Sequence, residues 1–203
     1  MLTTRYKTVL NRAFDVPARW LARFHLNPNA VTIGGVALVG ASCLFLLLTR
    51  RVIPFCFLVL LASLLDALDG AVARVSGRAT KFGAYLDAIC DRVGEALIVL
   101  TVASVTGYWA LSAVLLVGAM LVSYAKARAA MEVPVGNLEW PDLMERTERG
   151  SLYLAGLLAS RLVGWRPLER DLFWWTLVVL IALIYATVAQ RLLRAKRLIE
   201  ARG

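Results

Sequence analysis

The sequence predicts an all-α integral membrane protein, a bundle of six transmembrane helices preceded by an amphipathic helix in the membrane interface. Apolar residues make up 60% of the 203 residues and charged residues only 18%, and the mean hydropathy is +0.68. These proportions argue against a soluble domain with a charged surface. Charge, proline and glycine also divide the chain into apolar stretches of about 20 residues, the length that a helix needs to cross a bilayer.

The elements follow from these breaks. Residues 1–25 carry five cations among leucine and aromatic side chains, which favours an interfacial amphipathic helix, with a short soluble helix as the alternative. The polar stretch 132–147 contains two prolines and a glycine and indicates a loop. Residues 192–203 form a basic tail, and no repeat or linker divides the single membrane domain 1–203, whose bundle covers 29–191. We expect six spans, near 29–49, 52–75, 80–106, 108–131, 147–164 and 171–191.

The distribution of lysine and arginine predicts the orientation. With six crossings, 17 of the 23 cations fall on one side and five on the other, which places both termini in the cytoplasm of a multi-pass cell-membrane protein. We attribute the net charge of +9 to anionic lipids and phosphate-bearing ligands, and expect no nucleic acid partner. The three cysteines lie in apolar runs and indicate no disulfide framework, and the single histidine excludes metal sites built on several imidazoles.

Acidic residues within the spans are the strongest functional signal. Each charge there costs about 2.5–3.5 kcal/mol on insertion scales unless something compensates it. At 100° per residue the acids fall on one small-residue stripe of each of two consecutive spans, which a short turn makes antiparallel neighbours. We therefore expect four carboxylates to converge. The two stripes are Asp66, Asp69, Gly70 and Ala73 on one span, and Gly83, Asp87, Asp91 and Gly94 on the next.

Four converging carboxylates repel one another, so either some carry protons or a cation lies among them. Oxygen ligands without histidine or cysteine favour Mg²⁺ or Mn²⁺, and we expect a pair of ions. Arg74, Thr80 and Lys81 add groups suited to a pyrophosphate, although Lys81 also fits the ordinary excess of cytoplasmic positive charge. The alternative for the acids is contact between helices or a proton path, as in a transporter.

The order Asp66-x2-Asp69-Gly70-x2-Ala73-Arg74-x8-Gly83-x3-Asp87-x3-Asp91 resembles the signature of the CDP-alcohol phosphatidyltransferase family. This resemblance implies a homodimer of six-helix protomers with an active site open to the cytoplasm. It implies that Asp66, Asp69 and Asp87 are metal ligands, and that Asp91 is both a ligand and the general base.

The resemblance also implies contacts with the CDP-activated lipid. The entry to the first span resembles the family segment that approaches the nucleotide, and Thr80 resembles a CDP contact of phosphoinositide-type members. For Asn29, helix capping is an equal alternative. The implied CDP-lipid-binding residues are Asn29, Thr32, Gly70, Ala73, Arg74, Thr80 and Gly83.

The acceptor alcohol is indicated by two basic runs, Ser123–Ala129 and Met144–Arg149. These runs put four cations at the cytoplasmic ends of the fourth and fifth spans, where they suit a phosphorylated acceptor better than a neutral one. The runs resemble those of the phosphatidylinositol-phosphate synthase branch, including its archaeal relatives, although Thr147 stands where that branch commonly has proline. Carried over, Lys126, Arg128 and Arg146 hold the acceptor phosphate. Lys126 and Arg128 are about 200° apart on an ideal helix, and the alternative is cytoplasmic charge with Glu/Arg pairs in one turn.

The function that we expect is transfer of a phosphatidyl group from a CDP-linked lipid, diacyl or ether, to a phosphorylated polyol. Inositol phosphate is the acceptor that the basic runs favour most. CMP is released, Mg²⁺ or Mn²⁺ is required, and the step belongs to phospholipid biosynthesis. The alternatives are the same chemistry with glycerol 3-phosphate or another alcohol, and a small ion-coupled membrane transporter. The sequence leaves the roles of Arg92 and Glu95 open.

Overall fold

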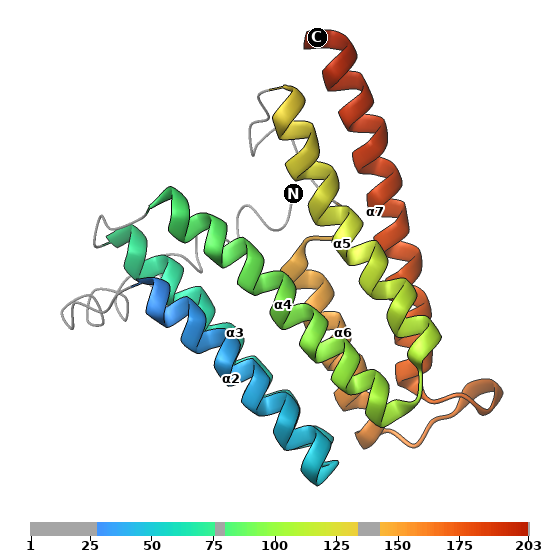
Figure 1. Cartoon of the computed structure of the whole chain (residues 1–203). Helices are drawn as coiled ribbons and strands as arrows, with labels where there is room; N and C mark the ends of the chain where they lie inside the picture. The colour runs from blue at the N-terminus through green and yellow to red at the C-terminus, as the bar shows by residue number, and fades with distance from the viewer. Residues whose placement is uncertain (1–27, 76–79, 134–142, 203) are drawn as a thin grey trace. The chain divides into compact units, whose positions relative to one another are not determined.

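The structure, a computed structural model, describes residues 28–75, 80–133 and 143–202, and within these ranges every regular element is helical. The side chains of residues 67–75 lie outside the described part. The predicted all-α class is confirmed, whereas the predicted interfacial helix at 1–25 lies outside the described residues. The elements (Figure 1) are α2 (Pro28–Thr49), α3 (Val52–Val75), α4 (Lys81–Thr106), α5 (Trp109–Glu132), α6 (Arg146–Leu162), the short 3-10 helix η2 (Pro167–Glu169) and α7 (Leu172–Arg202).

Five of the six α-helices begin and end within two residues of the expected spans, because the breaks are local in origin. Between α2 and α3, Arg50 takes a left-handed conformation with φ 57°, and between α4 and α5 the same region is filled by Gly107 with φ 81°. The exception is α7, which continues to Arg202 rather than ending near residue 191. Its last part is rich in leucine, arginine and alanine, which favour helix whether or not a membrane surrounds them.

Three helices are long and apolar enough to cross a membrane, namely Asn29–Thr49, Trp109–Glu132 and Leu172–Arg202. A shorter apolar helix covers Val52–Asp66, the part of α3 before the residues whose side chains are not described. In contrast, α4 and α6 carry several charged residues among their apolar ones. These helices agree with a membrane protein, and the count of six spans stays a prediction.

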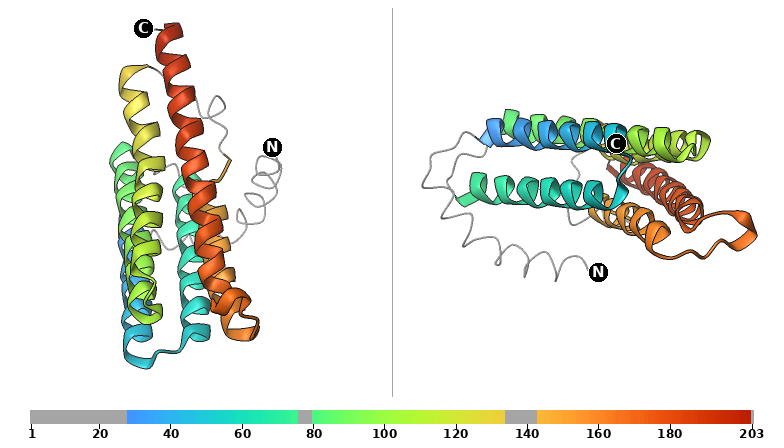
Figure 2. Two further views of the ribbon diagram at one scale, coloured as in Figure 1. Left: turned by 90° about the vertical axis from the view of Figure 1, so that its right-hand side faces the viewer. Right: turned by 90° about the horizontal axis from the view of Figure 1, so that it is seen from below.

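The chain consists of two compact units, of which the first comprises residues up to Thr101. Within it α2 packs along α3 as an antiparallel hairpin, which Figure 2 shows in its right-hand view. Its core includes Leu46 of α2 and Phe55 and Val59 of α3, all almost fully buried. The first turn of α4 lies close to the start of α2, since a methyl group at Gly83 would lie 3.2 Å from Asn29 Oδ1.

The second unit begins at Val102 and contains α5, α6 and α7. Both α5 and α6 pack against α7. Glycines make the close approach possible: a methyl group at Gly118 of α5 would lie 2.7 Å from Ile184 Cγ2 of α7. Near the middle of α6, the ring of Tyr153 meets that of Phe173, at the start of α7, edge to face with centroids 5.2 Å apart. The buried face of α7 therefore organises this unit.

Candidate active site

Three of the four predicted metal ligands come together in the first unit. Asp66 lies on α3, and Asp87 and Asp91 lie one turn apart on α4. One carboxylate oxygen of each lies within 4.8 Å of the others, and Asp66 and Asp91 are half-buried. The predicted convergence of the two acidic stripes is therefore observed for these three residues. The side chain of Asp69, the fourth predicted ligand, lies outside the described part, although the backbone of α3 is helical there.

The composition of this carboxylate cluster (Asp66, Asp87 and Asp91) fits a divalent cation. Like charges at this separation repel strongly in a partly desolvated site, and a cation between them reverses the sign of that interaction. All the donors are carboxylate oxygens, the ligands that Mg²⁺ and Mn²⁺ prefer. The arrangement thus agrees with the expected Mg²⁺ or Mn²⁺ cofactor, and it leaves the number of ions open.

Next to the cluster along α4, Arg92 and Glu95 form an ion pair. Arg92 Nη1 lies 2.7 Å from Glu95 Oε2, and both side chains are largely buried. This contact gives Arg92 and Glu95, whose roles the sequence left open, a common structural role as an ion pair. The pair is neutral as a whole, so it adds no net charge beside the three carboxylates.

The start of α4 brings together three residues of the predicted CDP-lipid site. The hydroxyl oxygen of Thr80 accepts a hydrogen bond from the backbone N–H of Gly83, with N and Oγ1 2.9 Å apart. This makes Thr80 the N-terminal cap of α4. Gly83 in turn lies against both Thr80 and Asn29, because a methyl group there would lie 3.1 Å from Thr80 Oγ1. Capping is thus an observed role of Thr80, and one that leaves its hydroxyl proton available to a ligand. Thr32, one turn further along α2 from Asn29, is buried.

The remaining residues predicted to bind the CDP-lipid are placed only by their backbone. Gly70, Ala73 and Arg74 belong to the last turns of α3, which the structure assigns as helix. Their side chains lie outside the described part. Because α3 is helical from Asp66 to Arg74, the spacing argument that puts them on one face holds for the backbone.

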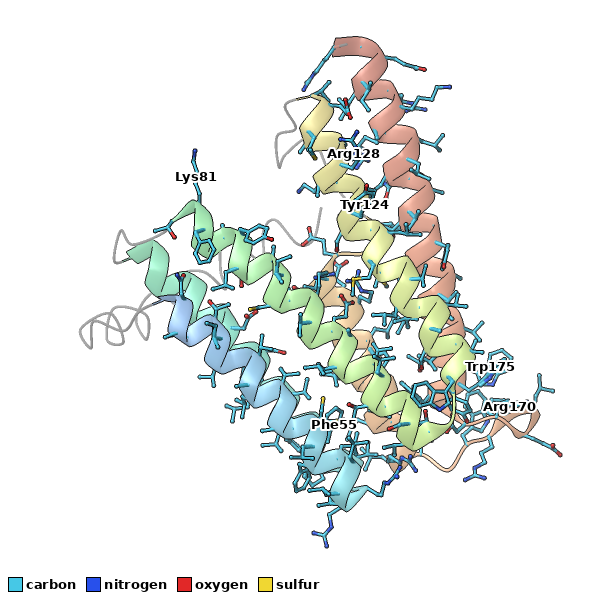
Figure 3. All side chains as sticks on the ribbon, in the orientation of Figure 1. Phe55, Lys81, Tyr124, Arg128, Arg170 and Trp175 are labelled. Carbon is cyan, nitrogen blue, oxygen red and sulfur yellow. The ribbon has the colours of Figure 1, made fainter. Side chains whose placement is uncertain are left out.

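The predicted acceptor-phosphate residues belong to the second unit. Lys126 and Arg128 lie near the end of α5, where Figure 3 shows Arg128 one turn beyond Tyr124. Arg128 Nη2 lies 2.6 Å from Glu132 Oε1, and both side chains are about half exposed. Such an exposed pair one helix turn apart is worth little in stability, so it does not hold Arg128 away from a ligand. It is, however, an acidic–basic pair within one turn, as the alternative interpretation of the basic runs expected.

Arg146 is the first residue of α6 and is exposed. The backbone N–H of Glu145, just before it, donates to Glu148 Oε2 at 3.0 Å, one half of a capping box. The acidic residues of this run therefore fix the start of the helix. Arg146 therefore stands at a helix start that Glu145 and Glu148 cap, and its role in binding the acceptor phosphate stays a prediction.

Sequence reasoning did not predict that two arginines are buried. Arg149 of α6 is 3% exposed and Arg191 of α7 is 6% exposed. Arg191 Nη1 donates a hydrogen bond to the backbone carbonyl of Val122 on α5. The signal for Arg191 was its register: it continues the apolar stripe of α7 at helical spacing, after Ile184 and Val188, whereas counting charges by membrane side treats every arginine as a surface group.

Comparison with known proteins identifies the family. The model of the CDP-alcohol phosphatidyltransferase family matches residues 25–183. The phosphatidylinositol phosphate synthase of Mycobacteroides abscessus is 35% identical over 181 residues, covering 85% of this chain and 78% of that protein. The archaetidylinositol phosphate synthase of Pyrococcus horikoshii is 30% identical over 184 residues, 89% of each chain.

Solved structures agree with this. The crystal structure of the Mycobacterium tuberculosis phosphatidylinositol phosphate synthase with CDP-DAG bound has a TM-score of 0.75 and 30% sequence identity, covering 91% of this chain and 94% of that one. The same synthase in complex with manganese and citrate gives a TM-score of 0.76 at 29% identity, covering 90% and 88%. The predicted enzyme class is confirmed over the transporter alternative: the chain belongs to the CDP-alcohol phosphatidyltransferase family and is a phosphatidyltransferase of the membrane.

Proposed function

We propose that this protein transfers a phosphatidyl group from a CDP-linked lipid to the hydroxyl of a phosphorylated polyol, inositol phosphate, and releases CMP. The observation that carries the proposal is the carboxylate cluster of Asp66, Asp87 and Asp91, whose oxygens lie within 4.8 Å of one another in a chain of this family. The names of its relatives, phosphatidylinositol phosphate and archaetidylinositol phosphate synthases, support the choice of acceptor.

In this proposal Asp66, Asp69, Asp87 and Asp91 hold two Mg²⁺ or Mn²⁺ ions. When bound, such ions offset the charge of a pyrophosphate and the charge that develops on the transferred phosphoryl group. Support comes from the all-oxygen donor set and from the manganese complex of the M. tuberculosis synthase. Arg74, Gly70 and Ala73 on α3, together with Asn29, Thr32, Thr80 and Gly83, bind the CDP-lipid.

The chemical step needs only one group that moves a proton. Asp91 takes the proton from the acceptor hydroxyl, whose oxygen forms the new bond to the phosphorus of the phosphatidyl group. The bond between that phosphorus and the CMP oxygen breaks, and CMP leaves as a phosphate anion that needs no proton. Asp91 is half-buried, and one of its carboxylate oxygens lies within 4.8 Å of the two other carboxylates, which supports a role beside the proposed metal ions.

The acceptor phosphate is held by Lys126, Arg128 and Arg146, with Arg149 one turn along α6. A phosphate dianion that leaves water requires several charged donors, which these residues supply. Arg146 is exposed at the helix start, which supports a contact with a substrate that arrives from solution. Arg149, which is buried, fits a supporting role beneath it.

We also propose that the single membrane domain has six spans with both termini in the cytoplasm, and that it works as a homodimer. Five of the six helices begin and end near the expected spans, α7 extends beyond its span, and three helices are apolar enough to cross the membrane by themselves. Of the charged residues of α4 and α6, Asp87, Asp91 and Arg146 belong to the proposed active site.

The test is release of CMP by the purified protein from CDP-diacylglycerol with Mn²⁺ or Mg²⁺ and one acceptor at a time. We expect turnover with inositol phosphate and little with free inositol. Glycerol 3-phosphate is the second acceptor to include, and preference for it would overturn the assignment of the polyol while keeping the reaction. Glu200→Gln, an exposed acidic residue far along α7, is the matched control for carboxylate variants and should keep wild-type turnover.

A further inference from the structure

Two consecutive residues of α7 contact the two segments that carry the proposed acceptor site. Gln190 Oε1 accepts the backbone N–H of Leu143 at 3.0 Å, a contact between residues 47 positions apart. Arg191 donates to the carbonyl of Val122, one turn before Lys126 on α5. We call Gln190 and Arg191 the α7 clamp. Since the side chains of consecutive helix residues point about 100° apart, the α7 clamp contacts both the segment before α6 and helix α5.

The Gln190 contact fixes the chain just before α6. Leu143 is followed by Met144, which is buried, then by Glu145, whose N–H binds Glu148, and then by Arg146. Only two residues, Met144 and Glu145, thus separate Leu143 from the proposed phosphate-binding arginine. The Leu143 side chain is exposed, so it is the backbone that Gln190 holds.

The amide of Gln190 is well suited to this contact. Its carbonyl oxygen accepts a hydrogen bond from an N–H group that precedes the helix and therefore has no partner within α6. A hydrocarbon side chain of the same length would fill the same space and offer no acceptor. The consequence of its loss would be a looser entry into α6, and recognition of a phosphate by an arginine is sensitive to displacements of about 1 Å.

We propose that Gln190 is a positioning residue for the acceptor: by holding the Leu143 amide it sets the place of Arg146, without touching substrate itself. The proposal rests on the proposed function, because it gives Arg146 the acceptor phosphate as ligand. It assigns a role in acceptor affinity to a neutral side chain that belongs neither to the family signature nor to the basic runs.

The experiment compares Gln190→Met, which keeps the length and removes the acceptor oxygen, with Gln190→Glu, which keeps an oxygen in the same place. CMP release is measured against the concentration of inositol phosphate and, separately, of CDP-diacylglycerol. We expect Gln190→Met to raise the acceptor KM about tenfold, the usual worth of one such hydrogen bond, with the lipid KM and kcat unchanged. Gln190→Glu should restore most of the acceptor KM. Leu193→Met, at an exposed position one turn on, is the control and should match the wild type.

A second measurement follows the hydrogen bond directly. Amide hydrogen exchange at residues 143–146 should be faster in Gln190→Met than in the wild type and near normal in Gln190→Glu. An acceptor KM that stays at the wild-type value in Gln190→Met overturns the proposal. So does an equal rise of both KM values with a lower melting temperature, which would mark a merely structural role.

The wild type separates this proposal from the function on which it rests. If the wild type releases no CMP with any phosphorylated acceptor, the proposed function fails and the role of Gln190 fails with it. If the wild type releases CMP but Gln190→Met and Gln190→Glu have the same acceptor KM, only the proposed role of Gln190 is wrong.

Discussion

Gly156 of α6 lies directly against Thr176 of α7, and a methyl group at the glycine would overlap both the Cγ2 and the Oγ1 atoms of the threonine. The threonine hydroxyl is itself bound to the carbonyl of Leu172 at 2.9 Å, so it has little freedom to move away. This contact sets how close α6 approaches α7.

The first prediction follows from that contact. Gly156→Ala should lower the stability of the protein by about 1–3 kcal/mol through overpacking, despite the better helix propensity of alanine. Thermal unfolding in detergent measures the effect. Gly150→Ala on the same helix has no atom within 4 Å of the added methyl group and is the matched control. Equal melting temperatures for the two variants would contradict the packing that the structure describes.

The second prediction concerns the base. Asp91→Asn should lower kcat by about 10²–10⁴-fold, because the amide cannot take the proton from the hydroxyl of the acceptor alcohol. Binding of the CDP-lipid should stay largely intact. Equilibrium binding of CDP-diacylglycerol and CMP release are measured on the same preparation. Comparable losses of binding and turnover would reduce Asp91 to one metal ligand among others.

The third prediction concerns the cation. Removal of divalent metal with EDTA should stop CMP release, and Mn²⁺ or Mg²⁺ should restore it. Asp66→Asn and Asp87→Asn should each weaken binding of Mn²⁺ as followed by electron paramagnetic resonance, since each removes one oxygen ligand from the carboxylate cluster. Glu200→Gln should bind Mn²⁺ as the wild type does. Unchanged Mn²⁺ binding in both cluster variants would place the ion elsewhere.

The fourth prediction concerns recognition of the acceptor. Arg146→Ala should raise the KM for inositol phosphate by roughly 10- to 100-fold, as expected for loss of a charged hydrogen bond, with a far smaller change in the KM for CDP-diacylglycerol. Steady-state kinetics with one substrate varied at a time make the comparison. Arg197→Ala, on the exposed end of α7, is a control for general loss of positive charge. Similar increases in both KM values would remove Arg146 from the acceptor site.

The fifth prediction concerns topology. In a variant without native cysteines, a cysteine replacing the exposed Leu168 should react with a membrane-impermeant thiol reagent added outside intact cells. A cysteine replacing Lys196 should react only after the cells are opened, because six spans put the end of α7 in the cytoplasm. Labelling of both positions from the same side would contradict the prediction that α7 crosses the membrane once between them.

The sequence predicted the helices well because their ends depend on local chemistry. Arg50 and Gly107 mark sharp turns between apolar stretches, and the structure places both in the left-handed region. The end of α7 was not predictable in the same way. Charge marks where a span leaves the bilayer, but arginine and leucine continue a helix into water equally well, so α7 extends to Arg202.

In the candidate site, too, the features that depend on local helix geometry were predictable, and those that depend on helix packing were not. Spacing alone predicted the convergence of Asp66, Asp87 and Asp91, because helix geometry fixes which residues share a face. The burial of Arg191 could be read only from its register on the apolar stripe of α7, and the contact of Gln190 with Leu143 depends on how the start of α6 packs on α7, which no local pattern encodes. Arg92 and Glu95 are intermediate: their spacing permits a pair, and the structure shows it.

The cap on α4 also bears on how mutants of that region should be interpreted. Thr80 begins the same helix on which two of the carboxylates stand, so an inactive alanine variant would report either a vanished ligand contact or a frayed first turn. Aspartate at this position would preserve the cap while placing a negative charge at the proposed CDP-lipid site. Serine would preserve both roles, and the pair of replacements would tell architecture from recognition.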